Sequence, residues 1–431
     1  MKSKITLLPS QLEGGVTIPP SKSLAHRYLI GAALSEGQSF IENIAKSVDI
    51  VSTINALQGM GVLFLEEPIN DNISNYVVKG VRRPLVSGNG IFDCAESGST
   101  LRFLIPLLLL TGEETTVIGR GKLVERPLDV YYELFDLKEI DYQKNQGLLP
   151  LNLKGNLIGG IYPIRGNVSS QFITGLLYAL PLVAEDSEII LTTPLESKPY
   201  VDLTLAVLKD YGIEINVAAD YISFKIKGGQ EYKSGTHRVE GDYSQVAFYA
   251  VGAVIGKKPI TCYGLKEDSL QGDKAILSII EAMGGSLEQR QEAIVFYPSK
   301  TKGITIDVTE CPDLVPALTL LGTLSEGITH IIGAERLKIK ESNRLESSAS
   351  ELNKLGGEII VESEGLLIKG VPNLGGNVVV ESWNDHRIAM TLAMATQRIE
   401  HPITLKGWES VEKSYPNFWE DYKMLGGTVN E

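Results

Sequence analysis

Cysteine is scarce in this sequence: Cys94, Cys262 and Cys311 are the only three among 431 residues. Their odd number and wide spacing exclude a disulfide framework and a cysteine-based zinc site. The five histidines show no metal-ligand spacing either. We therefore expect reduced thiols, a cytoplasmic location and no bound metal.

An excess of positive charge and long apolar runs are also lacking. Asp and Glu outnumber Lys and Arg by 53 to 40, which gives a formal net charge of −13. An acidic chain is a poor general partner for nucleic acid or for an anionic membrane surface. The longest apolar run, residues 103–110, is too short to span a bilayer. We expect neither nucleic-acid nor membrane partners, although a local basic pocket can still bind a small anion.

Sequence signatures of several enzyme classes are missing too. There is no Gly-x-x-x-x-Gly-Lys-Ser/Thr segment, so a nucleotide triphosphatase is not expected. Ser170 has no neighbouring base in the sequence, and a hydrolase triad is not indicated. Among the histidines, only His386, between Asp385 and Arg387 at a predicted helix start, is a candidate for chemistry.

Internal periodicity is the strongest positive signal in the chain. Five amphipathic segments with helical spacing end in a glycine, the residue that takes the left-handed C-cap at low cost, and a β-rich stretch follows each. These glycines are Gly61, Gly212, Gly284, Gly356 and Gly426. The last three steps are 72, 72 and 70 residues. The 151 residues from Gly61 to Gly212 leave room for a sixth copy near Lys138, where no glycine stands.

A second series runs alongside the first. Six nearly all-apolar helices are predicted to begin at polar residues spaced by 71 to 76 positions, near Ser21, Ser97, Ser169, Asp242, Asp313 and Asn384. An apolar helix must be buried, whereas an amphipathic helix covers a core with one face. The chain is therefore predicted to be an α/β protein of six units of about 72 residues, packed as two domains of three units each.

The starts of the apolar helices carry more cations than capping requires. For any single helix, plain N-capping is the simpler interpretation. Lysine or arginine nevertheless stands at or near most of these starts, as Lys22, Arg27, Arg102 and Arg387 do. Helix N-termini attract anions, so substrates rich in phosphate and carboxylate are indicated.

Nine segments of the chain resemble the 5-enolpyruvylshikimate-3-phosphate synthases, and together they span its length. The segments are Pro20-Ser21-Lys22-Ser23 with Arg27, Ser97-Gly98-Ser99 with Arg102, Glu125-Arg126-Pro127, Val168-Ser169-Ser170-Gln171-Phe172, Ser197-Lys198-Pro199-Tyr200, Val239-Glu240-Gly241-Asp242, Lys340-Glu341-Ser342-Asn343-Arg344-Leu345, Asn384-Asp385-His386-Arg387 and Lys413-Ser414-Tyr415-Pro416. Any one of them alone would be a weak signal, but the set is specific.

The resemblance implies the two-domain enolpyruvyl transferase fold, an inside-out α/β barrel in which each domain holds three βαβαββ-type units. The first domain would comprise residues 20–239. The second would comprise residues 1–19 and 240–431, with the active site in the cleft between the two domains.

The resemblance also implies an activity. The carboxyvinyl group of phosphoenolpyruvate would be transferred to the 5-hydroxyl of shikimate 3-phosphate by addition and elimination, with release of phosphate. This step belongs to the shikimate pathway to chorismate and the aromatic amino acids. No metal or organic cofactor is needed, the protein is expected to be a monomer, and glyphosate is a candidate inhibitor.

Roles follow residue by residue from the same resemblance. Asp313 would take the proton of the 5-hydroxyl, Glu341 and Lys22 are candidates for the proton transfers at the methylene carbon, and His386 completes the predicted catalytic set. The residues predicted to bind shikimate 3-phosphate are Ser23, Arg27, Ser169, Ser170, Ser197, Tyr200, Asp313 and Lys340. The residues predicted to bind phosphoenolpyruvate are Lys22, Gly98, Lys122, Gln171, Arg344, Arg387 and Lys413.

Three residues depart from the family pattern. Glu96 stands where asparagine is usual, Lys122 where arginine is usual, and Arg336 where asparagine is common. A carboxylate near the phosphoenolpyruvate site would repel the substrate unless a cation pairs with it, and a lysine lacks the bidentate fork of arginine. These departures affect the expected affinity and glyphosate sensitivity, not the reaction class.

Two alternatives stay open. UDP-N-acetylglucosamine 1-carboxyvinyltransferase shares the fold and the chemistry, but that family usually carries a cysteine in the loop before the Arg-Pro motif. Residues 119–127 contain none. A non-catalytic relative would be expected to have lost one of Lys22, Asp313, Glu341 or Lys413, and all four are present.

Overall fold

The computed structural model describes residues 3–145 and 149–430. By its internal contacts the chain divides into two compact units. We call Lys22–Val239 the inserted unit, and Met1–Ser21 with Glu240–Glu431 the terminal unit. The first crossing therefore falls between residues 21 and 22, two residues after the predicted position, and the second between residues 239 and 240.

The inserted unit contains three outer and three inner α-helices among its described residues. Its elements are α1 (Lys22–Leu34), β3 (Ser35–Glu36), β4 (Gln38–Ala45), α2 (Val48–Gly59), β5 (Leu63–Pro68), β6 (Ile73–Lys79), β7 (Ile91–Asp93), α3 (Gly98–Leu108), β8 (Thr115–Ile118), η1 (Gly121–Glu125), α4 (Asp129–Leu137), β9 (Asp141–Lys144), β10 (Leu151–Lys154), β11 (Gly160–Ile164), α5 (Ser170–Ala179), η2 (Leu180–Leu182), β12 (Ser187–Leu191), α6 (Lys198–Asp210), β13 (Ile215–Val217), β14 (Ser223–Ile226), β15 (Tyr232–Lys233) and β16 (Thr236–Arg238).

The terminal unit repeats this alternation of strands and helices. Its elements are β1 (Lys4–Leu7), β2 (Gly14–Thr17), α7 (Tyr243–Ile255), β17 (Ile260–Tyr263), η3 (Gly272–Ala275), α8 (Ile276–Ala282), β18 (Ser286–Arg290), β19 (Ala293–Tyr297), β20 (Thr305–Asp307), η4 (Pro312–Leu314), α9 (Val315–Thr323), β21 (Ile328–Ile332), η5 (Glu335–Ile339), α10 (Arg344–Lys354), β22 (Glu358–Val361), β23 (Leu366–Lys369), β24 (Val379–Glu381), α11 (His386–Ala395), β25 (Ile403–Lys406), η6 (Trp408–Lys413), α12 (Phe418–Met424) and β26 (Val429–Asn430).

One sheet pattern recurs throughout the described parts of the chain. Each unit contains three four-stranded sheets, and in every sheet one parallel pair is followed by two antiparallel pairs. The orders are β16-β4-β6-β5, β7-β8-β10-β9 and β11-β12-β14-β13 in the inserted unit, and β2-β17-β19-β18, β20-β21-β23-β22 and β24-β25-β1-β26 in the terminal unit. The six repeats predicted from the sequence are therefore six copies of one α/β unit.

Strands near the second crossing and near the N-terminus complete sheets whose other strands lie far away in the sequence. β16 pairs in parallel with β4, about 200 residues earlier. β2 pairs in parallel with β17, and β1 lies between β25 and β26. The two crossing segments are hydrogen-bonded to each other, since the Ser21 amide donates to the Glu240 carbonyl at 2.7 Å. Residues 3–21 are thus an integral part of the terminal unit.

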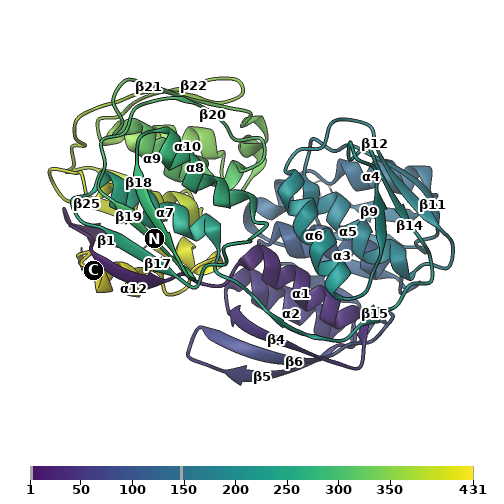
Figure 1. The fold of residues 1–431 in the computed structure, drawn as a ribbon. Helices are drawn as coiled ribbons and strands as arrows, with labels where there is room; N and C mark the ends of the chain where they lie inside the picture. Colours follow the sequence, from purple (N-terminus) through teal and green to yellow (C-terminus); the bar gives the residue numbers. More distant parts are fainter. Residues whose placement is uncertain (1–2, 146–148, 431) are drawn as a thin grey trace. The chain divides into compact units, whose positions relative to one another are not determined.

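The apolar helices form the cores. Every residue of α7, α9 and α11 is buried, and so is nearly every residue of α3 and α5. Figure 1 shows α7 and α9 within the terminal unit, and α3 and α5 within the inserted unit, with strands outside them. Among the helices that the structure describes, none is long and apolar enough to cross a membrane.

Five of the six outer helices that the structure describes are followed by a glycine, as the sequence predicted, and the sixth is followed by another residue. Gly61, Gly212, Gly284, Gly356 and Gly426 all have positive φ, between 77° and 104°, just beyond α2, α6, α8, α10 and α12. The sixth outer helix, α4, ends at Leu137, and Glu139 takes the left-handed position there with φ of 54°. A side chain therefore occupies the place that glycine has in the other five copies.

Candidate active site

Two helix starts of the inserted unit are joined by side chains. Ser169 caps α5 by accepting from the Gln171 amide at 3.3 Å. The Gln171 side-chain nitrogen donates to Ser99 Oγ at 2.9 Å, and its oxygen accepts from Arg102 at 2.7 Å. The predicted ligands on α3 and α5 therefore lie together.

Gly98, the first residue of α3, makes room for a guanidinium group. A Cβ at this position would stand 2.5 Å from an Nη1 of Arg126, and 3.6 Å from both Arg102 and Gln171. Arg126 is only 6% exposed. Two arginines and a side-chain amide thus surround the N-terminus of α3, whose first residue has no side chain. This arrangement is suited to a small anion.

Arg126 is a candidate ligand that the sequence analysis did not predict, whereas Lys122 makes its ion pair elsewhere. Lys122 is in the exposed η1 and pairs with Glu125 at 2.6 Å, where both side chains are more than half exposed. The signal for Arg126 was present in the Glu125-Arg126-Pro127 segment. The family resemblance assigns the ligand role to Lys122, at a position where arginine is usual, and only the structure shows which of the two cations turns inward.

Glu96 and Arg336, the other two residues predicted to depart from the family pattern, each contact a neighbouring segment. The Glu96 carboxyl group lies against Gly121, since a Cβ on that glycine would stand 2.6 Å from it. Arg336 is 9% exposed and donates to the Thr309 carbonyl in the terminal unit.

Two hydrogen bonds, one of them from Lys22, connect the starts of α1, α2 and α3. The Lys22 Nζ donates to Asp49 Oδ2 at 2.8 Å, and the two side chains are 17% and 11% exposed. The Asp49 carbonyl accepts from Thr100 in α3 at 3.4 Å. Asp49 was not predicted, because in the sequence it is an ordinary acidic residue in the first turn of an outer helix.

Arg27 faces the interior of the inserted unit. Its Nε donates to Thr204 Oγ1 at 2.9 Å, one Nη to the Ser23 carbonyl at 2.7 Å, and the other Nη to the Tyr200 carbonyl at 3.0 Å. Three of the five N–H groups of a guanidinium are thereby committed. Burial lowers the pKa of Arg27. The contacts give Arg27 a part in placing Ser23 and Tyr200.

The remaining predicted serines also lie at helix starts. Ser170 is the first residue of α5, and Ser197 directly precedes α6 with φ of 55°. Both are buried.

A dense ion-pair network surrounds Arg344, the first residue of α10 in the terminal unit. Its Nη1 lies 2.8 Å from Asp313 Oδ1, its Nη2 2.7 Å from Glu341 Oε2, and its Nε 2.8 Å from Asp385 Oδ2. Arg387 approaches the second oxygen of Asp313 at 2.8 Å. The Arg344 side chain is 2% exposed. Four residues predicted to act in the site thus come together around one buried guanidinium.

The network shifts the pKa values of its members. Burial alone would raise the pKa of Asp313, but Arg387 and Arg344 outweigh it and hold that pKa far below its usual value. Burial lowers the pKa of Lys340 to about 8; Asp313 opposes this shift, whereas Arg336 and Arg344 add to it. Asp313 is therefore ionised at neutral pH, and Lys340 loses its charge at a lower pH than an ordinary lysine.

Asp385 was named in the sequence only as a neighbour of His386, yet it organises this corner of the unit. It caps α11 by accepting from the Arg387 amide at 3.0 Å, and it also accepts from Ser342 at 3.0 Å. His386 Nδ1 lies 3.8 Å from Asp385 Oδ1, beyond hydrogen-bond distance. His386 is 2% exposed and adjoins the network, whereas Asp385 belongs to it.

Two further contacts complete the terminal cluster. Lys413, the last residue of η6, donates to the Asn384 carbonyl at 2.8 Å. Ser244, in the first turn of α7, accepts from Arg387 at 3.2 Å. Starts of α7, α10 and α11 thus meet here, together with η4.

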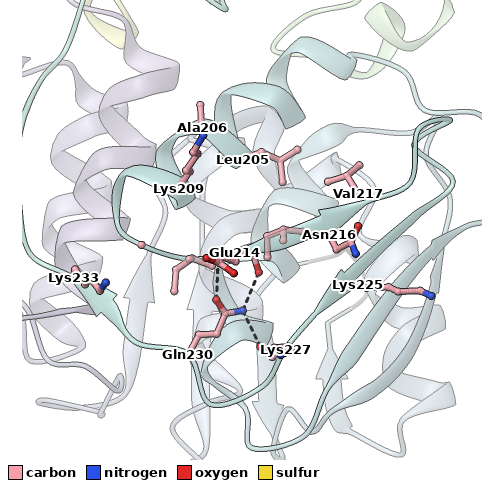
Figure 2. A pocket seen from close by; sticks show the side chains of 13 residues that line it. Leu205, Ala206, Lys209, Glu214, Asn216, Val217, Lys225, Lys227, Gln230 and Lys233 are labelled. Carbon is pink, nitrogen blue, oxygen red and sulfur yellow. Dashed lines mark hydrogen bonds between the residues drawn. The ribbon is translucent and has the colours of Figure 1, made fainter.

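A large groove lies elsewhere on the inserted unit (Figure 2). It has a volume of about 970 Å³ and runs between α6 and β13. Four lysines line it: Lys209, Lys225, Lys227 and Lys233. None of the predicted site residues lines this groove, so it is separate from the clusters described above.

Solved structures identify the class first. The fold matches an EPSP synthase from Acinetobacter baumannii with a TM-score of 0.82 and 25% identity, covering 99% of this chain and 100% of that one. It matches the enolpyruvyl transferase NikO from Streptomyces tendae with a TM-score of 0.79 at 15% identity, covering 100% and 99%. The fold is that of the enolpyruvyl transferases, as the sequence predicted.

Sequence comparison then defines the family. Residues 8–422 match the family described as EPSP synthase (3-phosphoshikimate 1-carboxyvinyltransferase). The 3-phosphoshikimate 1-carboxyvinyltransferase of Clostridium kluyveri is 50% identical over 99% of this chain and 98% of its own length, and that of Clostridium novyi is 48% identical with the same coverage. The chain belongs to the EPSP synthase family. Its function is therefore that of a transferase in the shikimate pathway, which serves aromatic amino acid biosynthesis, and this prediction is confirmed.

Proposed function

We propose that the two clusters serve one pair of substrates, shikimate 3-phosphate and phosphoenolpyruvate. The 5-hydroxyl oxygen adds to C2 of phosphoenolpyruvate while the methylene carbon gains a proton, which gives a tetrahedral ketal. Phosphate then leaves with the electrons of its C–O bond, and the methyl carbon loses a proton to restore the double bond. The single observation that best supports this chemistry is the pair of arginines, Arg344 and Arg387, converging on Asp313 at 2.8 Å each.

Asp313 is the proposed base for the 5-hydroxyl. Both of its oxygens are engaged by guanidinium groups, which makes it a weak base. A substrate carboxylate that takes hydrogen bonds from Arg344 and Arg387 would draw these cations from Asp313 and raise its pKa. Substrate binding would in this way prepare the base for its step.

Glu341 and Lys22 are the proposed groups for the proton transfers at the methylene carbon. Glu341 is held by Arg344 at 2.7 Å, and a substrate that takes over this contact would release the carboxyl group for proton transfer. Lys22 is held by Asp49 at 2.8 Å. His386 stays a catalytic candidate because it lies beside Asp385.

The binding roles are proposed as follows. Ser23, Ser169, Ser170, Ser197, Tyr200 and Lys340 would hold shikimate 3-phosphate together with Asp313, and Arg27 would position Ser23 and Tyr200. Gly98, Gln171, Arg344, Arg387, Lys413 and Lys22 would hold phosphoenolpyruvate. We assign to Arg126 the cationic role that the sequence analysis gave to Lys122, because Arg126 is the one that lies beside Gly98. Cations around the leaving phosphate stabilise the charge that develops on it.

Three properties complete the proposal. We expect a monomer of 46.9 kDa, which light scattering in solution would check. We expect glyphosate to inhibit the enzyme, which phosphate-release assays would check. A cytoplasmic location is also proposed, because the family members are biosynthetic enzymes.

The decisive experiment is phosphate release from phosphoenolpyruvate, with shikimate 3-phosphate and UDP-N-acetylglucosamine as separate acceptors. We expect release with shikimate 3-phosphate only. Asp313→Ala and Lys22→Ala should each lower kcat by about 100-fold or more. Phosphate release that depends on the sugar nucleotide would instead identify the alternative transferase. No phosphate release with either acceptor would refute the proposal.

A further inference from the structure

Two consecutive residues before α11 adopt a strained backbone. Trp383 and Asn384 both have φ of 56°, in the left-handed region that residues with a side chain rarely occupy. Such conformations persist only where surrounding contacts impose them, and they concentrate at functional sites. This turn leads directly into Asp385, His386 and Arg387.

Several parts of the candidate site depend on this turn. The Asn384 carbonyl accepts from Lys413 at 2.8 Å. The next residue, Asp385, holds Arg344 at 2.8 Å. A change in the turn would therefore move an acceptor for one proposed phosphoenolpyruvate ligand and an anchor for another.

Glu351 holds the turn through two hydrogen bonds. It lies on α10, seven residues after Arg344, and its side chain is 1% exposed. Its Oε1 accepts from the Trp383 indole at 2.7 Å, and its Oε2 accepts from the Glu381 amide at 2.9 Å. Lys354 donates to both oxygens, at 2.7 and 2.8 Å, and so balances the buried charge.

Burial does not hold the Trp383 ring, because this residue is 42% exposed. The indole is instead held by its hydrogen bond to a buried carboxylate, a strong kind of contact. Glu351 thereby ties the strained turn to the same helix that begins with Arg344.

We infer that Glu351 is a positioning residue for carboxyvinyl transfer: through the Trp383 indole and the Glu381 amide it holds the turn that places the Asn384 carbonyl against Lys413 and Asp385 against Arg344. It does not touch the substrates. This inference rests on the proposed function, in which Lys413 and Arg344 bind phosphoenolpyruvate.

Trp383→Phe is the sharpest test, because it removes the indole N–H and keeps an aromatic ring. We expect the KM for phosphoenolpyruvate to rise about 10-fold, while the KM for shikimate 3-phosphate changes less than twofold. Glu351→Gln should give a similar split, since an amide has a single oxygen acceptor and must lose at least one of the two bonds. The double variant should be no worse than the more impaired single variant, because both act on the same contact.

Glu346→Gln is the matched control. Glu346 is an exposed carboxylate on the same helix, and both Michaelis constants should be unchanged. A purely structural role for Glu351 would lower the melting temperature without separating the two KM values, and that result would overturn the inference. So would a fully active Trp383→Phe variant.

Hydrogen exchange of the free protein separates this inference from the proposed function. The amides of residues 382–386 should exchange about 10-fold faster in Trp383→Phe than in the wild type, whereas α7 amides should not change. If the wild type lacks the proposed activity but exchange still accelerates, the proposed function fails and the positioning contact stands. Unchanged exchange in the variant would refute the positioning contact itself.

Discussion

At the scale of single residues, Asp313 has a guanidinium group against each carboxylate oxygen, from Arg344 and Arg387, at 2.8 Å in both cases. Its pKa in the folded protein is therefore lower than in the unfolded chain. The stabilisation that follows is present above the unfolded pKa of about 3.9, and it is lost as the pH falls below that value. Binding geometry and acid stability thus depend on the same pair of contacts.

Lys340 should make the activity depend on pH on the alkaline side. Its pKa of about 8 lies below the unfolded value, so the free enzyme loses this cation as the pH rises through 8. We expect kcat/KM for shikimate 3-phosphate to fall towards a slope of about tenfold per pH unit above that point. Steady-state rates between pH 6 and 10 would measure it.

The conservative variant provides the control for this profile. Lys340→Arg keeps a charge throughout the range, because a guanidinium does not deprotonate there, and should remove the alkaline limb even if its rate is lower. An identical limb in this variant would show that another group titrates.

Arg126 and Lys122 offer a matched pair of cations four residues apart in the chain. Arg126→Ala should raise the KM for phosphoenolpyruvate by about 100-fold or lower kcat to match, since it removes a buried guanidinium beside Gly98. Lys122→Ala should change either constant less than threefold, because its exposed contact with Glu125 contributes little. Equal losses in both variants would contradict this assignment.

Sequence reasoning located most of the candidate site but not its inner contacts. Asp313, Glu341, Arg344 and Arg387 were predicted and do meet in the terminal unit. Asp49 was missed because nothing in the sequence marks an acidic residue of an outer helix as the partner of Lys22. Partners of this kind are chosen by packing between helices, which periodicity does not reveal.

At the scale of secondary-structure elements, the end of α4 is the exception among the outer helices. Five of them place glycine in the left-handed position, whereas Glu139 occupies it after α4 with φ of 54°. The sequence predicted a helix there and could not show that its end would take the same backbone shape without glycine. The shape is imposed by the repeat, since the chain must turn at this point to begin β9.

Glu139→Gly should stabilise the protein. The left-handed backbone costs a residue with a Cβ about 1–2 kcal/mol, and the flexibility of glycine in the unfolded chain offsets roughly half of this. We expect the free energy of unfolding to rise by about 0.5–1 kcal/mol, measured by urea denaturation.

Two control variants isolate the backbone effect. Glu139→Ala removes the same carboxylate but keeps the Cβ, and should bring no gain. Gly356→Ala should cost about 1 kcal/mol although a Cβ there would meet no atom within 4 Å, because its φ is 95°. A gain from alanine at position 139 would mean that the carboxylate, not the backbone, is unfavourable.

At the scale of the whole molecule, the two units have separate hydrophobic cores. The buried cluster that includes α1, α3 and α5 draws on residues 24–239 alone, and the cluster around α7, α9 and α11 on residues 5–18 and 243–425. The inserted unit is continuous in sequence. The terminal unit is not, and its β1 lies in the interior of a sheet, between β25 and β26.

Fragments should therefore behave unequally. Residues 22–239 should fold alone with a cooperative thermal transition by circular dichroism, because their core is complete. Residues 240–431 should not, because they lack β1 and β2. Joining residues 1–21 directly to residue 240 should restore folding, since the Ser21 amide and the Glu240 carbonyl are 2.7 Å apart. Cooperative folding of residues 240–431 without the N-terminal strands would contradict this account.

The sequence by itself determined the repeat, the class of each helix, the cations at the helix starts and the family. These are local properties, written in periodicity, in glycine positions and in short motifs. Only the tertiary structure decided that Arg126 and not Lys122 lies beside Gly98, that Glu139 replaces a glycine, and that Glu351 holds the Trp383 turn. Each of these depends on which side chain turns inward when distant segments pack, and packing between segments leaves no periodic trace in the chain.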